Sequence, residues 1–275
     1  MKIAYSPCPN DTFTFYAWAH GRIEAPLPEV VYADIDQTNQ WAEQGTGPEM
    51  MKISYGALPW VLDQYQLLPC GGALGRGCGP LVLTKDTYTE PVQLSGKTVA
   101  VPSERSTAYL LFRLWAEEHV PGGLGHVLVM PFHEIMPAVA EGTIDAGLVI
   151  HEARFTYPEY GLHELQDLGS WWETATGHPI PLGAIVAKRS LDAAPLASYI
   201  RASLEYAWAY PDETKSYVRE HAQEMNDEVA KQHIDLYVNE FTRDLGESGY
   251  QAIEELLGRA AEKGLVPSFK ETSLW

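Results

Sequence analysis

The strongest constraint on the fold is an alternation of short apolar runs with helical segments over the first 190 residues. The runs that we predict as strands are 2–5, 29–34, 52–58, 80–85, 97–102, 126–132, 145–151 and 182–188. The segments between them that we predict as helices are 11–20, 37–44, 58–66, 106–119 and 133–141. Strands that alternate with helices indicate an α/β fold with a sheet of the parallel type.

After residue 190 the pattern becomes helical. Apolar residues three and four positions apart predict helices over 196–210, 212–223, 228–242 and 248–264. Asp212 and Ser248 are the expected N-caps of the second and fourth of these helices, because short polar side chains accept hydrogen bonds from the first free amides.

A weak internal repeat indicates two lobes. The stretches "WAEQGTGPEMMKISYGAL" and "AVAEGTIDAGLVIHEA" each have a helix, a glycine-containing turn and a strand with small residues. With crossings at 85–96 and 172–182, residues 1–90 plus 180–275 form a discontinuous α/β lobe with C-terminal helices, and residues 91–179 form the second α/β lobe. We expect a central cleft where strand ends and helix starts face a ligand.

Charge and composition narrow the class of partner. A net charge of −18 argues against nucleic acid, and it requires that an anionic ligand be held by local donors. No apolar run approaches about 18 residues, and no signal peptide precedes the first strand, so we expect no membrane span and a cytoplasmic protein. The three cysteines have no CxxC spacing, which favours reduced thiols over a disulfide framework.

Two stretches resemble known functional motifs but lack features that those motifs require. The glycines of "GALGRGCGPLVL" precede a strand, whereas a dinucleotide-binding fingerprint follows a strand and opens a helix. The sequence "HEARF" lacks the second histidine that the zinc motif HExxH requires. We therefore expect neither a nucleotide nor a metal at these places.

Two polar clusters lie where a cleft would expose them. A helix begins near Ser106 or Thr107, and its free amides and positive dipole end suit a carboxylate, although both residues are also ordinary capping residues. Lys52 and Ser54 are two apart, so on a strand they point to one face, which is either a ligand-binding face or a solvent-exposed edge.

A third cluster contains His151, which follows an apolar strand at its carboxyl end. A single histidine is often structural, but imidazole has an unperturbed pKa near ~6.5 that suits proton abstraction at neutral pH. The adjacent Glu152 would point to the opposite face of a strand, so it is not an obvious partner.

Several long motifs together resemble the 1,4-dihydroxy-6-naphthoate synthases of the futalosine route to menaquinone. They are "SPCPNDTF", "KISYGAL", "GGALGRGCGPLVL", "VPSERSTAYLL" and "GLVIHEARFTYPEYGL", and the similarity covers most of the chain. The resemblance implies a two-lobed, periplasmic-binding-protein-like (type II) fold with a central cleft. It also implies a lyase that converts cyclic dehypoxanthine futalosine, a small anionic substrate, to 1,4-dihydroxy-6-naphthoate without a metal or organic cofactor.

The resemblance also implies roles for single residues. His151 would be the proton acceptor, and the substrate-contacting residues would be Lys52, Ile53, Ser54, Thr107 and Ala108. The stretch "SPCPNDTF" would then be the loop after the first strand, stiffened by Pro7 and Pro9. In it, Asn10 or Thr12 would either donate a hydrogen bond to the ligand or cap the following helix.

Two other functions remain open from the sequence. A non-catalytic protein that binds a small carboxylate could use the same fold, since fold does not fix function. An enzyme of the related dehydratase step of the same pathway is the other alternative. The stretch "VIHEARFTY" with its histidine favours the synthase.

Overall fold

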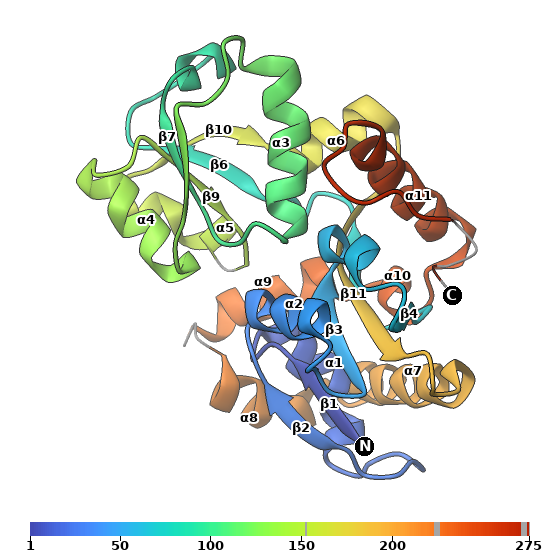
Figure 1. The fold of residues 1–275 in the computed structure, drawn as a ribbon. Helices are drawn as coiled ribbons and strands as arrows, with labels where there is room; N and C mark the ends of the chain where they lie inside the picture. The colour runs from blue at the N-terminus through green and yellow to red at the C-terminus, as the bar shows by residue number, and fades with distance from the viewer. Residues whose placement is uncertain (152, 223–225, 271–273, 275) are drawn as a thin grey trace. The chain divides into compact units, whose positions relative to one another are not determined.

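The computed structural model describes residues 1–151, 153–222, 226–270 and 274 of the chain (Figure 1). The chain divides into two compact units. Unit 1 comprises Met1–Gly75 and Pro181–Trp275, and unit 2 comprises Arg76–Ile180. None of the described helices is long and apolar enough to cross a membrane.

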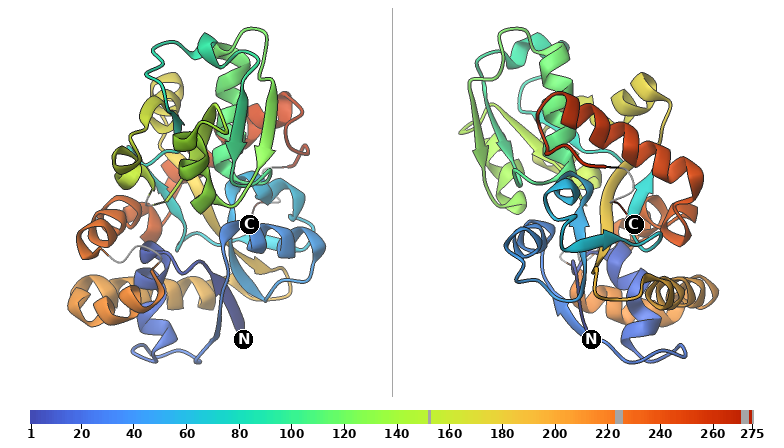
Figure 2. Two further views of the ribbon diagram at one scale, coloured as in Figure 1. Left: turned by 90° about the vertical axis from the view of Figure 1, so that its left-hand side faces the viewer. Right: turned by 45° about the vertical axis from the view of Figure 1, so that its right-hand side comes forward.

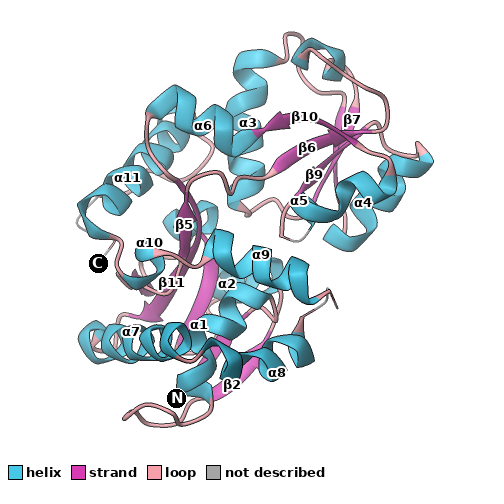
Figure 3. Ribbon diagram, turned by 180° about the vertical axis from the view of Figure 1, so that it is seen from behind, coloured by secondary structure: helices cyan, strands magenta, loops and turns pink. Residues whose placement is uncertain are grey.

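Unit 1 contains a mixed sheet whose order is β2-β1-β3-β11-β4, with β5 paired to β11. Figure 1 labels the strands of this path, and Figure 3 shows β5 and β11 from behind. Its strands are β1 (Lys2–Tyr5), β2 (Glu29–Tyr32), β3 (Met50–Ser54), β4 (Tyr65–Leu67), β5 (Ala73–Gly75) and β11 (Ile180–Lys188). Strand β1 runs parallel to β2 and β3, whereas β11 runs antiparallel to β3. The parallel part therefore sends the carboxyl ends of β1 and β3 to one edge of the sheet.

The helices of unit 1 bury a mostly apolar interior against this sheet. They are α1 (Pro9–Ala19), α2 (Ile35–Gln44), the 3₁₀ helix η1 (Tyr55–Trp60), α7 (Ala193–Ala209), α8 (Pro211–His221), α9 (Asp227–Tyr237), α10 (Glu240–Arg243) and α11 (Gly246–Glu262). Helix α1 is almost wholly buried and packs against α7, α8 and α9; in both views of Figure 2, α7 lies beside it. Phe13 of α1, Leu204 of α7 and Val218 of α8 meet in one apolar cluster.

Unit 2 contains a second mixed sheet with the order β10-β6-β9-β7-β8. Its strands are β6 (Leu81–Thr84), β7 (Thr98–Val101), β8 (His126–Val129), β9 (Ala146–Val149) and β10 (His163–Asp167). Strand β7 runs parallel to β8 and β9, and β6 runs antiparallel to β9 and β10. The carboxyl ends of β7, β8 and β9 therefore lie at one edge.

The helices of unit 2 follow these strands. They are η2 (Pro91–Leu94), α3 (Thr107–His119), α4 (Phe132–Glu141), α5 (Ala153–Thr156), η3 (Tyr157–Tyr160) and α6 (Leu168–Thr176). Ile135 and Val139 of α4 pack on Leu83 and Ala100 of the sheet to form the core of this unit.

The α/β class and the eight predicted strands are confirmed, but other details of the prediction are wrong. The helix predicted over 58–66 is absent among the described residues: Pro59 lies in the 3₁₀ helix η1, and residues 65–67 form strand β4. Asp212 and Ser248 are not N-caps, because α8 starts with Pro211 after Tyr210, and α11 starts at Gly246 after Leu245.

The first crossing between the units lies earlier in the chain than the sequence indicates. Residues 76–90 are assigned to the first lobe by the sequence interpretation, whereas β6 pairs with β9 and β10 in the sheet of unit 2. A buried apolar run identifies a strand but carries no signal for its pairing partner. The second crossing, at residues 180 and 181, lies one residue from the expected boundary.

All three cysteines are free and buried, and two of them should resist alkylation. Burial raises the pKa of Cys70 and of Cys78 to about 12. At pH 8, roughly one thiol in 10⁴ would be ionised at each position, and the thiolate is the nucleophile. Iodoacetamide followed by peptide mapping should leave Cys70 and Cys78 unmodified in the native protein and modify both in urea. Equal labelling rates in the two conditions would contradict this prediction.

Candidate active site

At the carboxyl edge of the parallel strands in unit 1, polar side chains from two chain segments come together. The segment after β1 contains Ser6, Asn10 and Asp11, and β3 ends with Lys52 and Ser54. All five are buried. Open α/β sheets bind ligands at such edges.

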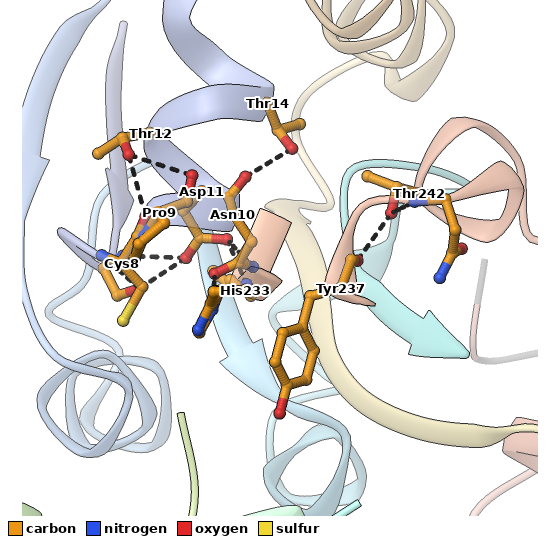
Figure 4. A network of polar contacts seen from close by, with 12 residues as sticks. Cys8, Pro9, Asn10, Asp11, Thr12, Thr14, His233, Tyr237 and Thr242 are labelled. Carbon is orange, nitrogen blue, oxygen red and sulfur yellow. Dashed lines mark hydrogen bonds and ion pairs between the residues drawn. The ribbon is translucent and has the colours of Figure 1, made fainter. Parts of the chain in front are cut away.

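The Asp11 carboxylate is the centre of this network (Figure 4). Its Oδ1 forms an ion pair with Lys52 Nζ and accepts a hydrogen bond from Asn10 Nδ2 at 2.9 Å. Its Oδ2 accepts hydrogen bonds from Ser6 Oγ at 2.7 Å and from the Ser6 amide at 3.3 Å. The Asp11 and Lys52 side chains are only 1% and 8% exposed, so each charge depends on the other for compensation.

Asn10 extends the network to His233 of α9. An ionised carboxylate only accepts hydrogen bonds, so the Asn10 amide nitrogen faces Asp11 and the Asn10 oxygen faces His233. His233 Nε2 lies 3.0 Å from that oxygen and therefore carries a hydrogen. Asn10 thus uses both ends of its amide within unit 1.

The expectation that Asn10 or Thr12 caps the first helix is wrong. Helix α1 begins with Pro9, two residues earlier than expected, and its N-cap Cys8 has no side-chain capping bond. The Thr12 hydroxyl donates to the carbonyls of Cys8 and Pro9, at 3.1 and 3.3 Å. Proline at the first helical position explains the early start, since its fixed φ suits a helix and its missing amide hydrogen costs nothing there.

Lys52 reaches Asp11 because a glycine lies beside its side chain. Gly183 of β11 is paired with Ser54, and a Cβ atom there would come within 2.7 Å of Lys52 Cε. The Lys52 ammonium, expected to contact substrate, is thus held by Asp11. Ile53, on the opposite face of the strand, is completely buried.

Ser54 is held by Asn39 of α2 through two hydrogen bonds. The Ser54 amide donates to Asn39 Oδ1 at 2.8 Å, and Asn39 Nδ2 donates to Ser54 Oγ at 3.0 Å. No described residue accepts the hydroxyl hydrogen of Ser54, so this hydrogen is available to a ligand oxygen. Asn39 was not identified from the sequence, where it is one of several polar residues on an amphipathic helix.

In unit 2, the start of α3 follows the carboxyl end of β7. Ser106 is the N-cap, and its Oγ accepts a hydrogen bond from the Tyr109 amide at 3.1 Å. Thr107 and Ala108 are the first two residues of the helix and are buried. The Ala108 amide donates to no described residue, so it can bind an anion with the support of the helix dipole.

His151 lies beyond the carboxyl end of β9, which is the parallel neighbour of β7. The structure therefore places His151 at the same sheet edge as Thr107. Its ring centroid is 5.5 Å from that of Phe132, which starts the helix after β8. Glu152 lies outside the described residues.

The backbone of His151 is strained. With φ of 57°, it is the one non-glycine residue in the left-handed region within the described part of the chain. This conformation costs about 1–3 kcal/mol and is frequent at functional positions, where the surrounding structure enforces it. No three His, Cys, Asp or Glu side chains among the described residues are grouped as metal ligands.

Comparison with known proteins agrees with this architecture. Among solved structures, a protein from Archaeoglobus fulgidus superimposes with a TM-score of 0.88 at 34% identity, over 96% of this chain and 98% of that one. The periplasmic aliphatic sulphonate binding protein of Escherichia coli gives a TM-score of 0.67 at 11% identity, over 98% and 88% of the chains. The fold is therefore of the periplasmic-binding-protein class, as expected from the sequence.

Beyond the fold, sequence comparisons identify the family of the chain. A family model described as menaquinone biosynthesis matches residues 1–262. A 1,4-dihydroxy-6-naphthoate synthase of Streptomyces coelicolor is 63% identical over 100% of this chain and 97% of its own length. A protein of the same name from Thermus thermophilus is 47% identical, over 97% and 96%. The chain belongs to this menaquinone biosynthesis family.

Proposed function

We propose that this protein is a carbon–carbon lyase that converts cyclic dehypoxanthine futalosine to 1,4-dihydroxy-6-naphthoate and releases a small sugar-derived fragment. The observation that carries the proposal is the 63% identity, over the whole chain, to a protein that bears the name of that synthase. The placement of His151 and of the α3 amides at one sheet edge gives the chemistry suitable groups.

His151 is the proposed general base. A neutral imidazole can take an acidic C–H proton from the substrate near neutral pH. The product ring is aromatic, and its formation supplies the driving force for fragment release. The enzyme's task is then to remove the proton and to hold the substrate oxygens while negative charge develops.

Each unit, taken by itself, offers groups that can bind a substrate oxygen. In unit 2, the Ala108 amide and the Thr107 residue at the start of α3 would hold a carboxylate or a developing oxyanion. In unit 1, the Ser54 hydroxyl would donate to a substrate oxygen, while Lys52 and Asn10 shape its surroundings and Ile53 packs on the other face of β3. Lys52 then acts through its ion pair with Asp11. Donors that are held in fixed positions orient the substrate for reaction and so increase the rate of the chemical step.

The direct test is an activity assay. Purified protein is incubated with cyclic dehypoxanthine futalosine, and formation of the naphthoate is followed by absorbance and mass spectrometry, with the His151→Asn variant as control. Release of the fragment together with the naphthoate supports the proposal. Tight binding of the naphthoate without turnover would instead indicate a binding protein. Loss of water alone from a carboxylic acid supplied in place of cyclic dehypoxanthine futalosine would indicate the dehydratase step.

The three thiols, which form no disulfide, suit the cytoplasm as the proposed compartment.

Removal of the proposed oxygen donors should weaken ligand binding. Ser54→Ala and Thr107→Val should each weaken binding of the naphthoate by about 1–3 kcal/mol, because a charged carboxylate loses a hydrogen bond in a buried site. Isothermal titration calorimetry measures this affinity. Thr174→Val is the matched control, because the Thr174 hydroxyl donates to the Ser170 carbonyl of its own helix. Unchanged affinity in both test variants would place Ser54 and Thr107 outside the site.

A further inference from the structure

Arg154, three residues after His151, makes two strong contacts that the proposed chemistry does not use. Its Nη1 donates to the Gly79 carbonyl at 2.8 Å, and its Nη2 pairs with Asp167 Oδ2 at 2.6 Å. The Arg154 side chain is 19% exposed and that of Asp167 is 10% exposed. Charge-assisted bonds of this length in a mostly buried place are strong and directional.

The two acceptors of Arg154 lie where the segment before β6 packs against the start of α6. Asp167 is the N-cap of α6, and its Oδ1 accepts hydrogen bonds from the Gly169 and Ser170 amides at 2.8 and 3.1 Å. The Gly79 and Gly169 backbones are in contact, since a Cβ atom on Gly79 would come within 2.2 Å of the Gly169 nitrogen. The guanidinium is therefore bound to a closely packed part of unit 2.

On the other side, Arg154 belongs to α5, which begins two residues after His151. This helix has only four residues, and a helix that short is not stable on its own. The Arg154 amide lies 3.4 Å from the His151 carbonyl, which closes one turn between the two residues. The left-handed backbone of His151 thus directly precedes a turn that Arg154 holds in place.

We infer that Arg154 is a positioning residue for His151: its guanidinium ties the turn after His151 to Gly79 and Asp167, and so keeps the imidazole at the sheet edge. This inference rests on the proposed function, in which His151 is the base. Without the guanidinium contacts, the His151 backbone can relax to an ordinary φ and the imidazole leaves its place. Substrate binding by other groups persists, so kcat falls while KM changes little.

The test compares three variants. Arg154→Met keeps most of the apolar stem and removes both contacts, whereas Arg154→Lys keeps a cation that can pair with Asp167. Arg76→Met is the matched control, because Arg76 donates to the Gly177 carbonyl at 2.8 Å and pairs with Glu173 at the other end of α6. We expect kcat to fall about 10- to 100-fold in Arg154→Met with little change in KM. Part of kcat should return in Arg154→Lys, and Arg76→Met should resemble the unmodified protein.

A second readout does not depend on activity. In protein with isotope-labelled histidine, the His151 ring resonance is assigned from its absence in His151→Asn. It should shift or broaden in Arg154→Met and stay unchanged in Arg76→Met. If Arg154→Met does not fold, Asp167→Asn replaces it, because that change keeps an oxygen for the α6 cap and removes the charge that faces Arg154.

The outcomes separate the inference from the proposed function. A lower melting temperature with unchanged kcat and an unchanged His151 resonance would overturn the inference and leave Arg154 a purely stabilising residue. Full activity in His151→Asn would overturn the proposed base, while the His151 resonance in Arg154→Met would still decide whether Arg154 positions this side chain.

Discussion

Replacing His151 with asparagine should lower kcat by roughly 10²–10⁴, because the substrate proton loses its acceptor. Asparagine is the better replacement, since it tolerates the left-handed backbone that His151 adopts at φ of 57°. Alanine should lower kcat equally, but it should also reduce stability by about 1 kcal/mol through backbone strain. Steady-state kinetics with cyclic dehypoxanthine futalosine, together with thermal unfolding of each variant, separates the two effects.

The matched control for this experiment is His163→Ala, which removes an exposed imidazole from strand β10 of the same unit. It should leave kcat and stability unchanged. If His151→Asn retains more than about a tenth of the unmodified kcat, far above the range expected for loss of a general base, His151 is not the base.

Replacing Asp11 with alanine should destabilise the protein by about 3–5 kcal/mol, because the buried Lys52 ammonium would lose its counter-charge. In the double variant Asp11→Ala/Lys52→Met, no unpaired charge remains, and we expect a large part of this stability to return. Urea unfolding of the unmodified protein, both single variants and the double variant gives the coupling free energy between the two positions.

The control pair is Lys231 and Asp235, which are one helical turn apart on α9 with side chains 67% and 61% exposed. Asp235→Ala should produce no measurable change in stability, because exposed ion pairs are solvated and screened. A loss from Asp11→Ala as small as that from Asp235→Ala would mean that water compensates Lys52 and that the pair does not organise the segment after β1.

The sequence predicts those parts of the site that depend on local order along the chain. In a parallel βα unit, the residues after a strand and at the start of the next helix reach the same sheet edge. Thr107 and His151 were identified on this basis, and the pairing of β7 with β9 brings their segments to one edge. Both assignments needed only a strand, its end and the loop or helix start that comes next.

Contacts between distant segments were not predictable in this way. Asp11 pairs with Lys52, 41 residues away, and Asn10 meets His233, 223 residues away. Asp11 lies in the stretch "SPCPNDTF" after the first strand, but the identity of its partner depends on how β1 and β3 are paired. The strand β6 illustrates the same limit, because its apolar run was recognised and its sheet was not.

The closeness of Gly183 to Lys52 has an evolutionary consequence. A Cβ atom at position 183 would come within 2.7 Å of Lys52 Cε, so an alanine there would require the outer part of the lysine side chain to move. Because the Lys52 ammonium pairs with Asp11, that movement would also disturb the buried ion pair. A substitution at position 183 should therefore be tolerated more readily once the Asp11–Lys52 pair has itself been replaced, which couples the three positions in the history of the chain.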